Sequence, residues 1–470
     1  MIAAHSFAGQ TVAVLGLGKS GLSAARALAA GGAKVRAWDD DPKRREAAAA
    51  KGLVLEDPYA MEWRGIAALV LSPGIPLHRP EPHQVVTQAR CGGATVIGDI
   101  ELFAREKLPA PVVAITGTNG KSTTTALTAF VLRQAGRKAV EGGNLGTPVL
   151  DLPNPGADGA YALELSSYQI DLTQSLAADV AVLLNLSPDH IDRHGSLAGY
   201  IAAKERLFQM QRRDQLAVIG VDDADSRALF ERLAAIPGRR VMAVSATQPV
   251  KHGVYVQDGV LFDATGGAAK SVVDLKAGKL KGVHNWQNAA AAFAAATALG
   301  CAPSVAADAL LAFPGLAHRI EDVGEVDGVR FYNDSKATNA DAAARALACF
   351  DEVYWIAGGR PKEGGIASLA EYFPRIRHAF LIGEAAPAFA ATLHGKVQVT
   401  HSGTLGRAVA DAFHLARAEY RGKPVVLLSP ACASFDQFTN FEARGDQFRA
   451  LASSLTAAGG GSAGHAGRAA

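Results

Sequence analysis

The chain has 470 residues, with 47 Lys and Arg, 45 Asp and Glu, and four cysteines. A single hydrophobic core stops growing at about 250–300 residues, so this length predicts two to four domains. The formal charge of +2 gives no reason to expect a nucleic acid or an anionic membrane as partner. The cysteines are far apart without CxxC spacing, which argues against zinc and a disulfide framework and favours a reducing cytoplasm.

The sequence does not lead us to expect an export signal or a membrane-spanning segment. Residues 1–10 lack a positively charged region followed by an apolar core, and no uninterrupted apolar run reaches about 18 residues. We therefore expect a soluble protein without membrane insertion. Residues 456–470 have almost nothing to bury and are expected to form a disordered tail.

Residues 11–39 predict a strand, a glycine-rich turn, a helix and a second strand. The turn is Gly16–Gly21 (GLGKSG), and Asp39 stands about where a ribose-binding carboxylate is expected. Taken alone, this pattern favours an NAD-type domain, but a helix N-terminus would bind any nucleotide diphosphate equally well. A later strand, 67–71, ends in Ser72–Ile75, a turn that either contacts a ligand or is ordinary chain punctuation.

The most informative stretch is Pro111–Thr125, PVVAITGTNGKSTTT. A continuous apolar strand leads through two glycines into a helix, the arrangement that lets backbone amides approach phosphate oxygens. The common GxxxxGK[ST] pattern would need glycine in place of Ile115, so this loop is two residues tighter. We interpret the stretch as an ATP cradle whose contacts are Gly117, Thr118, Asn119, Gly120, Lys121, Ser122 and Thr123.

Polar side chains follow the later strands of the same region. Asn144, Glu164 and His190 stand near strand ends; a carboxylate and a histidine beside a phosphate loop favour magnesium binding, although a lone histidine is more often structural. Composition alone would place Lys204 on a solvated helix surface.

Asn285 and Asn288 open an alanine-rich helix, where their amides could read an adenine edge or merely cap the helix.

Proline-rich breaks near 109–111 and 313–315 divide the chain into three α/β regions. In the last region several predicted strands lead into polar clusters, as expected at the carboxyl edge of an open parallel sheet. We therefore predict an α/β protein of three open-sheet domains. They are a Rossmann-like domain (1–99), a P-loop ATPase-like central domain (100–315) and a Rossmann-like C-terminal domain (316–455).

These motifs together resemble the Mur ligase family of bacterial peptidoglycan synthesis. NDSKATN and SPACASFDQFTNF are similar to the branch of the family that adds D-glutamate. The match spans nearly the whole chain, through Gly117–Thr123, Asn185–Arg193, His284–Asn288, His318-Arg319, Asn333–Asn339 and Ser429–Phe441. It implies that the first domain holds the uridine diphosphate of a precursor, with contacts from Gly16, Leu17, Gly18, Asp39, Ser72, Gly74 and Asn144.

The resemblance implies an ATP-dependent ligase. ATP would phosphorylate the carboxylate of UDP-N-acetylmuramoyl-L-alanine, and the amine of D-glutamate would attack the acyl phosphate. The protein must then position the reactants and neutralise charge on the transferring group. The implied catalytic residues are Lys121, His190 and Lys204; two magnesium ions would be held by Ser122, Glu164, His190 and Lys204. Arg319 and Asp334 would reach ATP from the third domain, which requires domain closure.

The family match assigns two further features. Lys204 would be carbamylated and so become an oxygen ligand for magnesium; the alternative is an unmodified lysine that contacts phosphate. The amino-acid site would consist of Thr338, Lys362, Ser434 and Phe441, with Lys362 pairing a glutamate carboxylate unless Arg360 takes that part. We expect a cytoplasmic monomer that acts on small molecules.

Three other classes of protein explain parts of the sequence. A nucleotide-binding regulator would not need Glu164, His190 and Lys204 together, and an NAD-dependent dehydrogenase would leave the phosphate cradle unexplained. A folate-type polyglutamate ligase shares the cradle but lacks the first domain.

Overall fold

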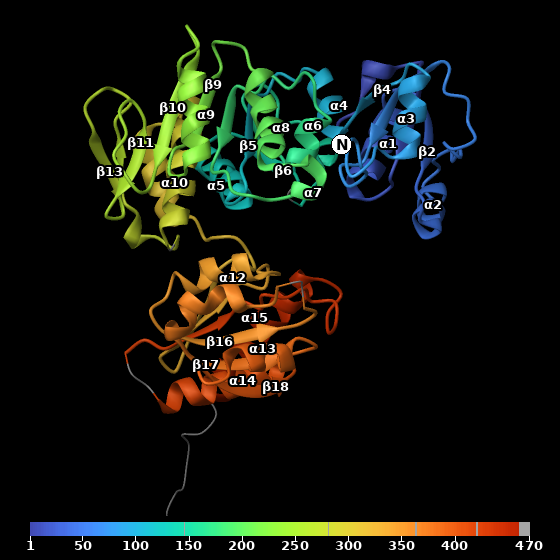
Figure 1. The fold of residues 1–470 in the computed structure, drawn as a ribbon. Helices are drawn as coiled ribbons and strands as arrows, with labels where there is room; N and C mark the ends of the chain where they lie inside the picture. Colours follow the sequence, from blue (N-terminus) through green and yellow to red (C-terminus); the bar gives the residue numbers. More distant parts are fainter. Residues whose placement is uncertain (145, 281, 362–363, 420–421, 460–470) are drawn as a thin grey trace, which may run out of the picture. The chain divides into compact units, whose positions relative to one another are not determined.

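The computed structural model describes residues 1–470 except for 145, 281, 362–363, 420–421 and 460–470. The chain divides into two compact units, Met1–Phe313 and Pro314–Ala470. Within the described residues, the first unit carries a four-stranded and a nine-stranded sheet, and the second a six-stranded sheet. Figure 1 colours them blue, green to yellow, and orange to red. The predicted α/β class with three open sheets is confirmed.

The first sheet is parallel, with strand order β2-β1-β3-β4. Its central strand reads TVAVL because both of its faces are buried: Val12 and Val14 pack in one core, Ala13 and Leu15 in another. The elements are β1 (Thr11–Leu15), α1 (Lys19–Ala30), β2 (Lys34–Trp38), α2 (Pro42–Ala49), β3 (Ile66–Leu71), α3 (Gln84–Cys91) and β4 (Thr95–Ile97).

The central sheet has the order β13-β12-β11-β10-β9-β8-β5-β7-β6. At one edge of this sheet, β12 pairs antiparallel with both β11 and β13. Asp258-Gly259 forms the hairpin turn between β11 and β12, with φ angles of 51° and 81°, as a type I′ turn requires. The strands are β5 (Val112–Thr116), β6 (Ala139–Gly143), β7 (Ala160–Glu164), β8 (Val180–Leu183), β9 (Leu216–Gly220), β10 (Arg240–Ser245), β11 (Val254–Gln257), β12 (Val260–Asp263) and β13 (Lys270–Asp274).

Small side chains let one helix pack deep in this region. Residues 289–296 of α10 are all 0% exposed, and the helix contacts α5 and the strands β9 and β11. The alanine-rich stretch is therefore core packing and not low complexity. The helices are α4 (Asp99–Arg105), α5 (Lys121–Gln134), α6 (Ser167–Asp171), α7 (Ile191–His194), α8 (Leu197–Gln209), α9 (Ala224–Ala234), α10 (Val283–Ala298) and α11 (Pro303–Ala312).

The first two sheets share one hydrophobic core. Helix α4 packs against both α1 and α6, and a single buried cluster contains Val12, Ile100 and Leu163. This continuity explains why Met1–Phe313 is one compact unit although it holds two sheets. The three domain ranges 1–99, 100–315 and 316–455 stay predictions.

The second unit has the order β14-β15-β19-β16-β17-β18. The expectation of a wholly parallel sheet is wrong at one edge, because β14 returns antiparallel through Asp327-Gly328, a second turn with two positive φ angles. The elements are β14 (Glu321–Val326), β15 (Val329–Asn333), α12 (Ala340–Leu347), β16 (Val353–Gly358), β17 (Ile376–Ile382), α13 (Ala386–Leu393), β18 (Gln398–Gly403), α14 (Leu405–Ala418), β19 (Val425–Leu428) and α15 (Phe441–Gly459).

Helix α15 continues past position 456, where the tail was predicted to begin. The rest of that predicted tail, 460–470, lies outside the described residues. None of the helices in the described ranges is long and apolar enough to cross a membrane.

Candidate active site

The predicted phosphate cradle is the turn between β5 and α5. Gly117 and Gly120 have φ angles of 148° and 83°, which side-chain-bearing residues rarely adopt. A Cβ on Gly120 would lie 2.2 Å from Asn288 Oδ1, so space as well as backbone conformation requires glycine there. Helix α5 begins directly afterwards at Lys121, which directs the amide groups of its first turn toward the loop.

The segment after β8 holds the cradle in place. The amides of Thr118 and Asn119 donate to the main-chain oxygen and to Oδ1 of Asn185, both at 2.9 Å. Ser187 N donates to Thr118 Oγ1 at 3.0 Å, and Tyr200 OH lies 3.1 Å from that oxygen. The N–H groups of Thr118 and Asn119 are therefore already engaged, which the sequence pattern did not predict for two expected ATP contacts.

Two lysines converge on the cradle. Lys121 Nζ donates to the carbonyl oxygens of Gly117 and Thr118, both at 2.8 Å. Lys204 Nζ donates to the same Gly117 oxygen at 3.1 Å and to Thr116 Oγ1 at 3.2 Å. Lys204 is only 1% exposed, so the solvated surface position that composition alone would give it is wrong. Burial, and then the charge of Lys121, lower the pKa of Lys204 well below its usual value.

A buried carboxylate lies at the end of β7. Glu164 is 3% exposed, and its Oε1 accepts a hydrogen bond from Asn144 Nδ2 at 2.7 Å. Its Oε2 is buried, and no group in the described part of the chain hydrogen-bonds to it. An orphaned carboxylate oxygen of this kind suits a hard cation such as magnesium. Asn144, expected at the precursor, is engaged with Glu164.

His190 is more exposed than the other predicted ligands. Its φ of 51° lies in the left-handed region, its side chain is 45% exposed, and its ring packs against Tyr168 with centroids 4.8 Å apart. Among the described residues, no group of three or more His, Cys, Asp and Glu side chains is placed to hold a metal. Of the predicted ligands only Glu164 and His190 are of these types, so the full ligand set stays a prediction.

The two asparagines of α10 connect this helix to the cradle. Asn288 Oδ1 accepts from Thr124 Oγ1 at 3.2 Å, and its Nδ2 donates to Asn285 Oδ1 at 3.1 Å. Neither residue is the N-cap of α10, which is Gly282. Neither asparagine therefore caps α10 from the N-cap position, and the contact with adenine stays a prediction.

A cleft of about 490 Å³ opens at the carboxyl edge of the first sheet. Asp39 borders it, but its Oδ2 accepts from Leu17 N at 2.6 Å and its Oδ1 from Asp41 N at 2.9 Å. Burial alone would raise the pKa of Asp39, but the hydrogen bonds from these two amides and the interaction with Arg44 outweigh burial, so the pKa lies below its usual value. Most of the predicted precursor contacts line the cleft, namely Gly16, Gly18, Asp39, Ser72 and Gly74.

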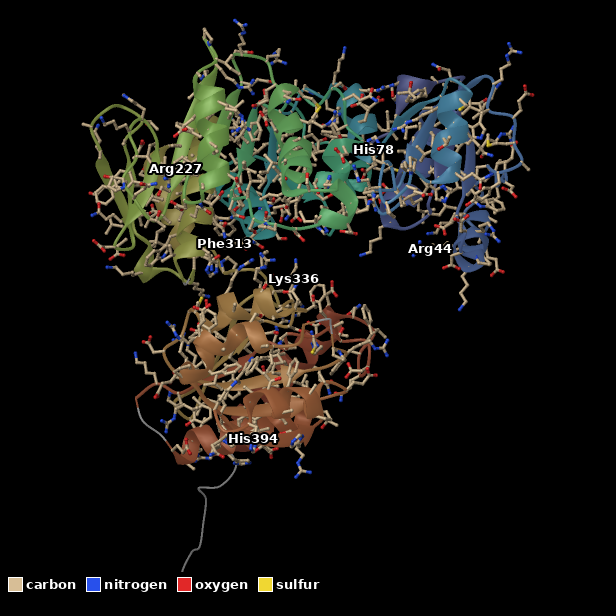
Figure 2. All side chains as sticks on the ribbon, in the orientation of Figure 1. Arg44, His78, Arg227, Phe313, Lys336 and His394 are labelled. Atoms are coloured by element: carbon tan, nitrogen blue, oxygen red, sulfur yellow. The ribbon has the colours of Figure 1, made fainter. Side chains whose placement is uncertain are left out.

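Basic residues missed by the sequence reasoning also border this cleft. Lys19 is the first residue of α1, and Arg44, labelled in Figure 2, lies on α2. A third basic residue, Arg193, acts on the turn that borders the cleft: it donates to the carbonyl oxygens of Pro73, Gly74 and Ile75 at 3.3, 2.8 and 2.9 Å. It stacks on Tyr168 at 4.6 Å and so ties the Ser72–Ile75 turn to the central region. The sequence signal for Lys19 was its position within GLGKSG.

In the second unit the predicted residues lie at the carboxyl edge of the sheet. Asp334 follows β15; its Oδ2 accepts from Ser429 Oγ at 2.8 Å and its Oδ1 from Ile320 N at 3.2 Å. Burial raises the pKa of Asp334 to about 7, against the opposing effects of Ser429 and Arg319. The residues of the predicted amino-acid site lie on the segment after β15, the segment after β19 and the start of α15: Thr338, Ser434 and Phe441.

Lys362 lies outside the described residues. Its alternative, Arg360, is exposed and donates to Glu384 Oε1 at 3.4 Å. The choice between these two cations for a glutamate carboxylate therefore stays open.

Glycine-rich turns stand at strand ends in both sheets of the first unit, each followed by a helix. This arrangement defines a nucleotide-binding α/β protein. Comparison with known families narrows the class. The MurD-like N-terminal domain of Mur ligases matches residues 10–98, the Mur ligase middle domain matches 115–296, and the Mur ligase glutamate ligase domain matches 318–432. The chain belongs to the Mur ligase family.

Curated relatives are similar along almost the whole chain. The UDP-N-acetylmuramoylalanine–D-glutamate ligase of Caulobacter vibrioides is 54% identical over 467 residues, covering 98% of this chain and 99% of that protein. The enzyme of the same name from Phenylobacterium zucineum is 54% identical and covers 97% and 98%. The predicted family and the predicted class of enzyme, an ATP-dependent ligase, are confirmed.

Solved structures show the same fold at low identity. The UDP-N-acetylmuramate-alanine ligase MurC of Thermotoga maritima aligns with a TM-score of 0.57 at 17% identity, over 95% of this chain and 99% of that one. The MurF ligase of Thermotoga maritima in complex with ADP aligns with a TM-score of 0.55 at 18% identity, over 84% and 90%.

Proposed function

We propose that this protein joins D-glutamate to the carboxylate of UDP-N-acetylmuramoyl-L-alanine at the expense of ATP, as a cytoplasmic monomer. The observation that carries the proposal is the 54% identity over 467 residues with the Caulobacter ligase of that name.

The cradle would act on the phosphates of ATP. A carboxylate and an amine do not condense in water, so the γ-phosphoryl group first passes to the precursor carboxylate, and the amine then displaces phosphate from the acyl phosphate. Lys121 would exchange its two loop carbonyls for phosphate oxygens and so offset the charge of the transferring group. Asn285 and Asn288, beside the cradle, would face the adenine.

The unpartnered Oε2 of Glu164 supports a magnesium site beside the cradle. Ser122, His190 and a carbamylated Lys204 would complete the donors for two ions, and the metal would supply charge stabilisation for the transferring phosphoryl group. The lowered pKa of Lys204 favours the carbamate, because only an uncharged amine reacts with carbon dioxide.

The remaining predicted residues would bind the other two substrates. The cleft of the first sheet would take the uridine diphosphate, with Lys19 and Arg44 offsetting its charge. Thr338, Ser434, Phe441 and Lys362 would bind D-glutamate, while Arg319 and Asp334 would contact ATP.

Phosphate release from ATP tests the proposal. The purified protein is assayed with UDP-N-acetylmuramoyl-L-alanine and, in parallel, D-glutamate, L-glutamate, L-alanine or diaminopimelate. We expect release with D-glutamate alone, together with a product larger than the precursor by one glutamyl residue. Phosphate release with one of the other amino acids would contradict the proposal. So would the absence of phosphate release and of precursor consumption with D-glutamate.

A further inference from the structure

A buried arginine lies beneath the predicted amino-acid site. Arg444, on α15, is 1% exposed. Its Nε donates to Ser335 Oγ at 2.9 Å, and its Nη2 donates to the carbonyl oxygens of Ser335 at 2.8 Å and Cys432 at 3.1 Å. Its Nη1 is also buried but has no hydrogen-bond partner among the described residues. A buried N–H without an acceptor is costly, so this one is poised to interact with an added group.

The charge of Arg444 is not neutralised locally. No carboxylate in the described part of the chain lies within ion-pair distance of its guanidinium. The groups that raise its pKa are first Cys432, a thiol, and then the carboxyl groups of Asp436 and Asp334, neither of which forms an ion pair with it; burial raises the pKa of Asp334 to about 7. Burial lowers the pKa of Arg444 to about 10, so it stays protonated at neutral pH. A buried cation without a counter-charge favours binding of an anion nearby.

The hydrogen bonds of Arg444 join the segments that carry the predicted site. Ser335 lies between β15 and Thr338, and Cys432 lies between β19 and Ser434. Ser335 Oγ also donates to the carbonyl oxygen of Phe441 at 2.8 Å. One side chain therefore fixes the spacing of the three backbones on which Thr338, Ser434 and Phe441 stand.

Close packing places Nη1 beside the end of β16. A Cβ added to Gly359 would lie 3.2 Å from Nη1 and 2.4 Å from the carbonyl oxygen of Ala433. Gly359 has a φ of 131° and directly precedes Arg360, in the segment that leads toward position 362. The unpartnered N–H is thus on the side of the guanidinium that faces this polar edge of the sheet.

We propose that Arg444 is a positioning residue that also makes the amino-acid site prefer a dicarboxylate over its neutral amide analogue. The inference rests on the proposed D-glutamate ligase function. The hydrogen bonds to Ser335 and Cys432 hold the site residues in register, and the uncompensated charge favours the second carboxylate of the amino acid.

Three variants separate these two effects. Arg444→Gln removes the charge, Arg444→Lys keeps the charge but loses the planar fork, and Ser335→Ala keeps the arginine but removes one acceptor. Arg407→Gln is the matched control, because it removes an exposed arginine from α14 of the same unit. Each is assayed for the KM of D-glutamate, ATP and precursor, for selectivity for D-glutamate over D-glutamine, and for its melting temperature.

We expect Arg444→Gln to raise the KM for D-glutamate about tenfold, the usual size of a lost charged hydrogen bond, and to lower selectivity over D-glutamine by a similar factor. The KM values of ATP and precursor should stay near those of wild type. Arg444→Lys and Ser335→Ala should raise the KM for D-glutamate but keep the selectivity. Arg407→Gln should match wild type throughout.

An unchanged KM for D-glutamate in Arg444→Gln would overturn the inference, as would equal rises for all three substrates, which indicate a purely structural role. If Arg444→Gln does not fold, Arg444→Lys decides: loss of the preference over D-glutamine while the charge is kept would contradict the electrostatic part. Wild type tests the proposed function separately, since a wild-type enzyme that ignores D-glutamate refutes that function whatever the variants do.

Discussion

Lys121 and Lys204 donate hydrogen bonds to the same acceptor, the carbonyl oxygen of Gly117, at 2.8 and 3.1 Å. Two ammonium groups this close repel each other, and the charge of Lys121 contributes to the lowered pKa of Lys204. An arriving phosphate would relieve the repulsion at Lys121, and carbamylation would relieve it at Lys204. The cradle in this structure is therefore electrostatically prepared for negative charge.

Lys121→Ala should abolish most of the ligase activity and leave the protein folded. The side chain contacts loop carbonyls at the mouth of the cradle and not the hydrophobic core. Loss of one preorganised electrostatic group usually costs on the order of 10²–10³ in rate, so kcat should fall by that factor. Steady-state phosphate release and thermal unfolding measure the two effects. Near-normal turnover would show that the cradle does not bind the triphosphate.

Lys204→Ala should be inactive, and wild-type activity should depend on carbon dioxide. The amine of Lys204 is buried with a lowered pKa, so a larger fraction than usual is uncharged and able to form a carbamate. Labelling with ¹³C-bicarbonate should give one carbamate signal that Lys204→Ala lacks. As a control, replacing the exposed Lys276 should leave that signal unchanged. An active alanine variant would rule out the modification as a requirement for catalysis.

Gly120→Ala should impair ATP binding more than a glycine-to-alanine change at another position of similar backbone conformation. Its Cβ would lie 2.2 Å from Asn288 Oδ1, so the contact between α5 and α10 must shift. Gly136→Ala is the control, since Gly136 has a nearly equal φ of 82° but nothing within 4 Å of its added Cβ. Both variants carry the backbone strain of about 1–2 kcal/mol, and only Gly120→Ala should also raise the KM for ATP. Equal effects of the two changes on that KM would contradict a role for Asn288 at the nucleotide.

The sequence was most informative where local chemistry determines structure. The strand, turn and helix of the cradle and the GLGKSG turn were predictable because glycine positions and apolar runs are local signals. The burial of Lys204 was not, since it depends on α8 packing over the cradle, a long-range contact. Arg193 and Arg444 were missed for the same reason: each bonds to a backbone carbonyl far away in the chain, that of Gly74 for Arg193 and that of Ser335 for Arg444.

Two antiparallel hairpins were missed although their signal is local. Asp258-Gly259 and Asp327-Gly328 stand between short apolar runs, and Asp-Gly is a strong indicator of a two-residue hairpin turn. The second was overlooked because the last region was interpreted as an open parallel sheet. Around the first, the alternating apolar residues predicted short strands and turns but not how the strands pair.

Arg193→Lys should weaken precursor binding while leaving ATP binding nearly unchanged. The guanidinium holds three carbonyls of the turn that borders the cleft of the first sheet, and a lysine cannot reach all three with one ammonium. We expect the KM for the precursor to rise about tenfold, the cost of one or two hydrogen bonds. Arg227→Lys is the control, because Arg227, labelled in Figure 2, donates to the carbonyl of Val221 away from the cleft. A larger rise in the KM for ATP than for precursor would contradict this placement.

Asp334→Asn should change how stability depends on pH. Burial raises the pKa of Asp334 to about 7 in the folded protein, compared with about 3.9 in an unfolded chain. A raised folded-state pKa gives stability that is complete below the unfolded value and is lost as pH rises toward 7, because the buried carboxyl must then ionise. Above that pH its contribution is constant. The asparagine variant lacks this titration.

Thermal unfolding of both proteins between pH 4.5 and 8.5 tests this expectation. Below pH 7, the free energy of unfolding of wild type, compared with that of the variant, should fall by at most about 1.4 kcal/mol for each pH unit. The melting temperature of wild type should therefore approach or drop below that of Asp334→Asn as pH rises, and the difference should level off above neutrality. Asp351→Asn, an exposed position in the same unit, should stay parallel to wild type. If the curves of wild type and Asp334→Asn run parallel across this range, the buried carboxyl does not titrate there, and Ser429 and Arg319 hold it ionised throughout.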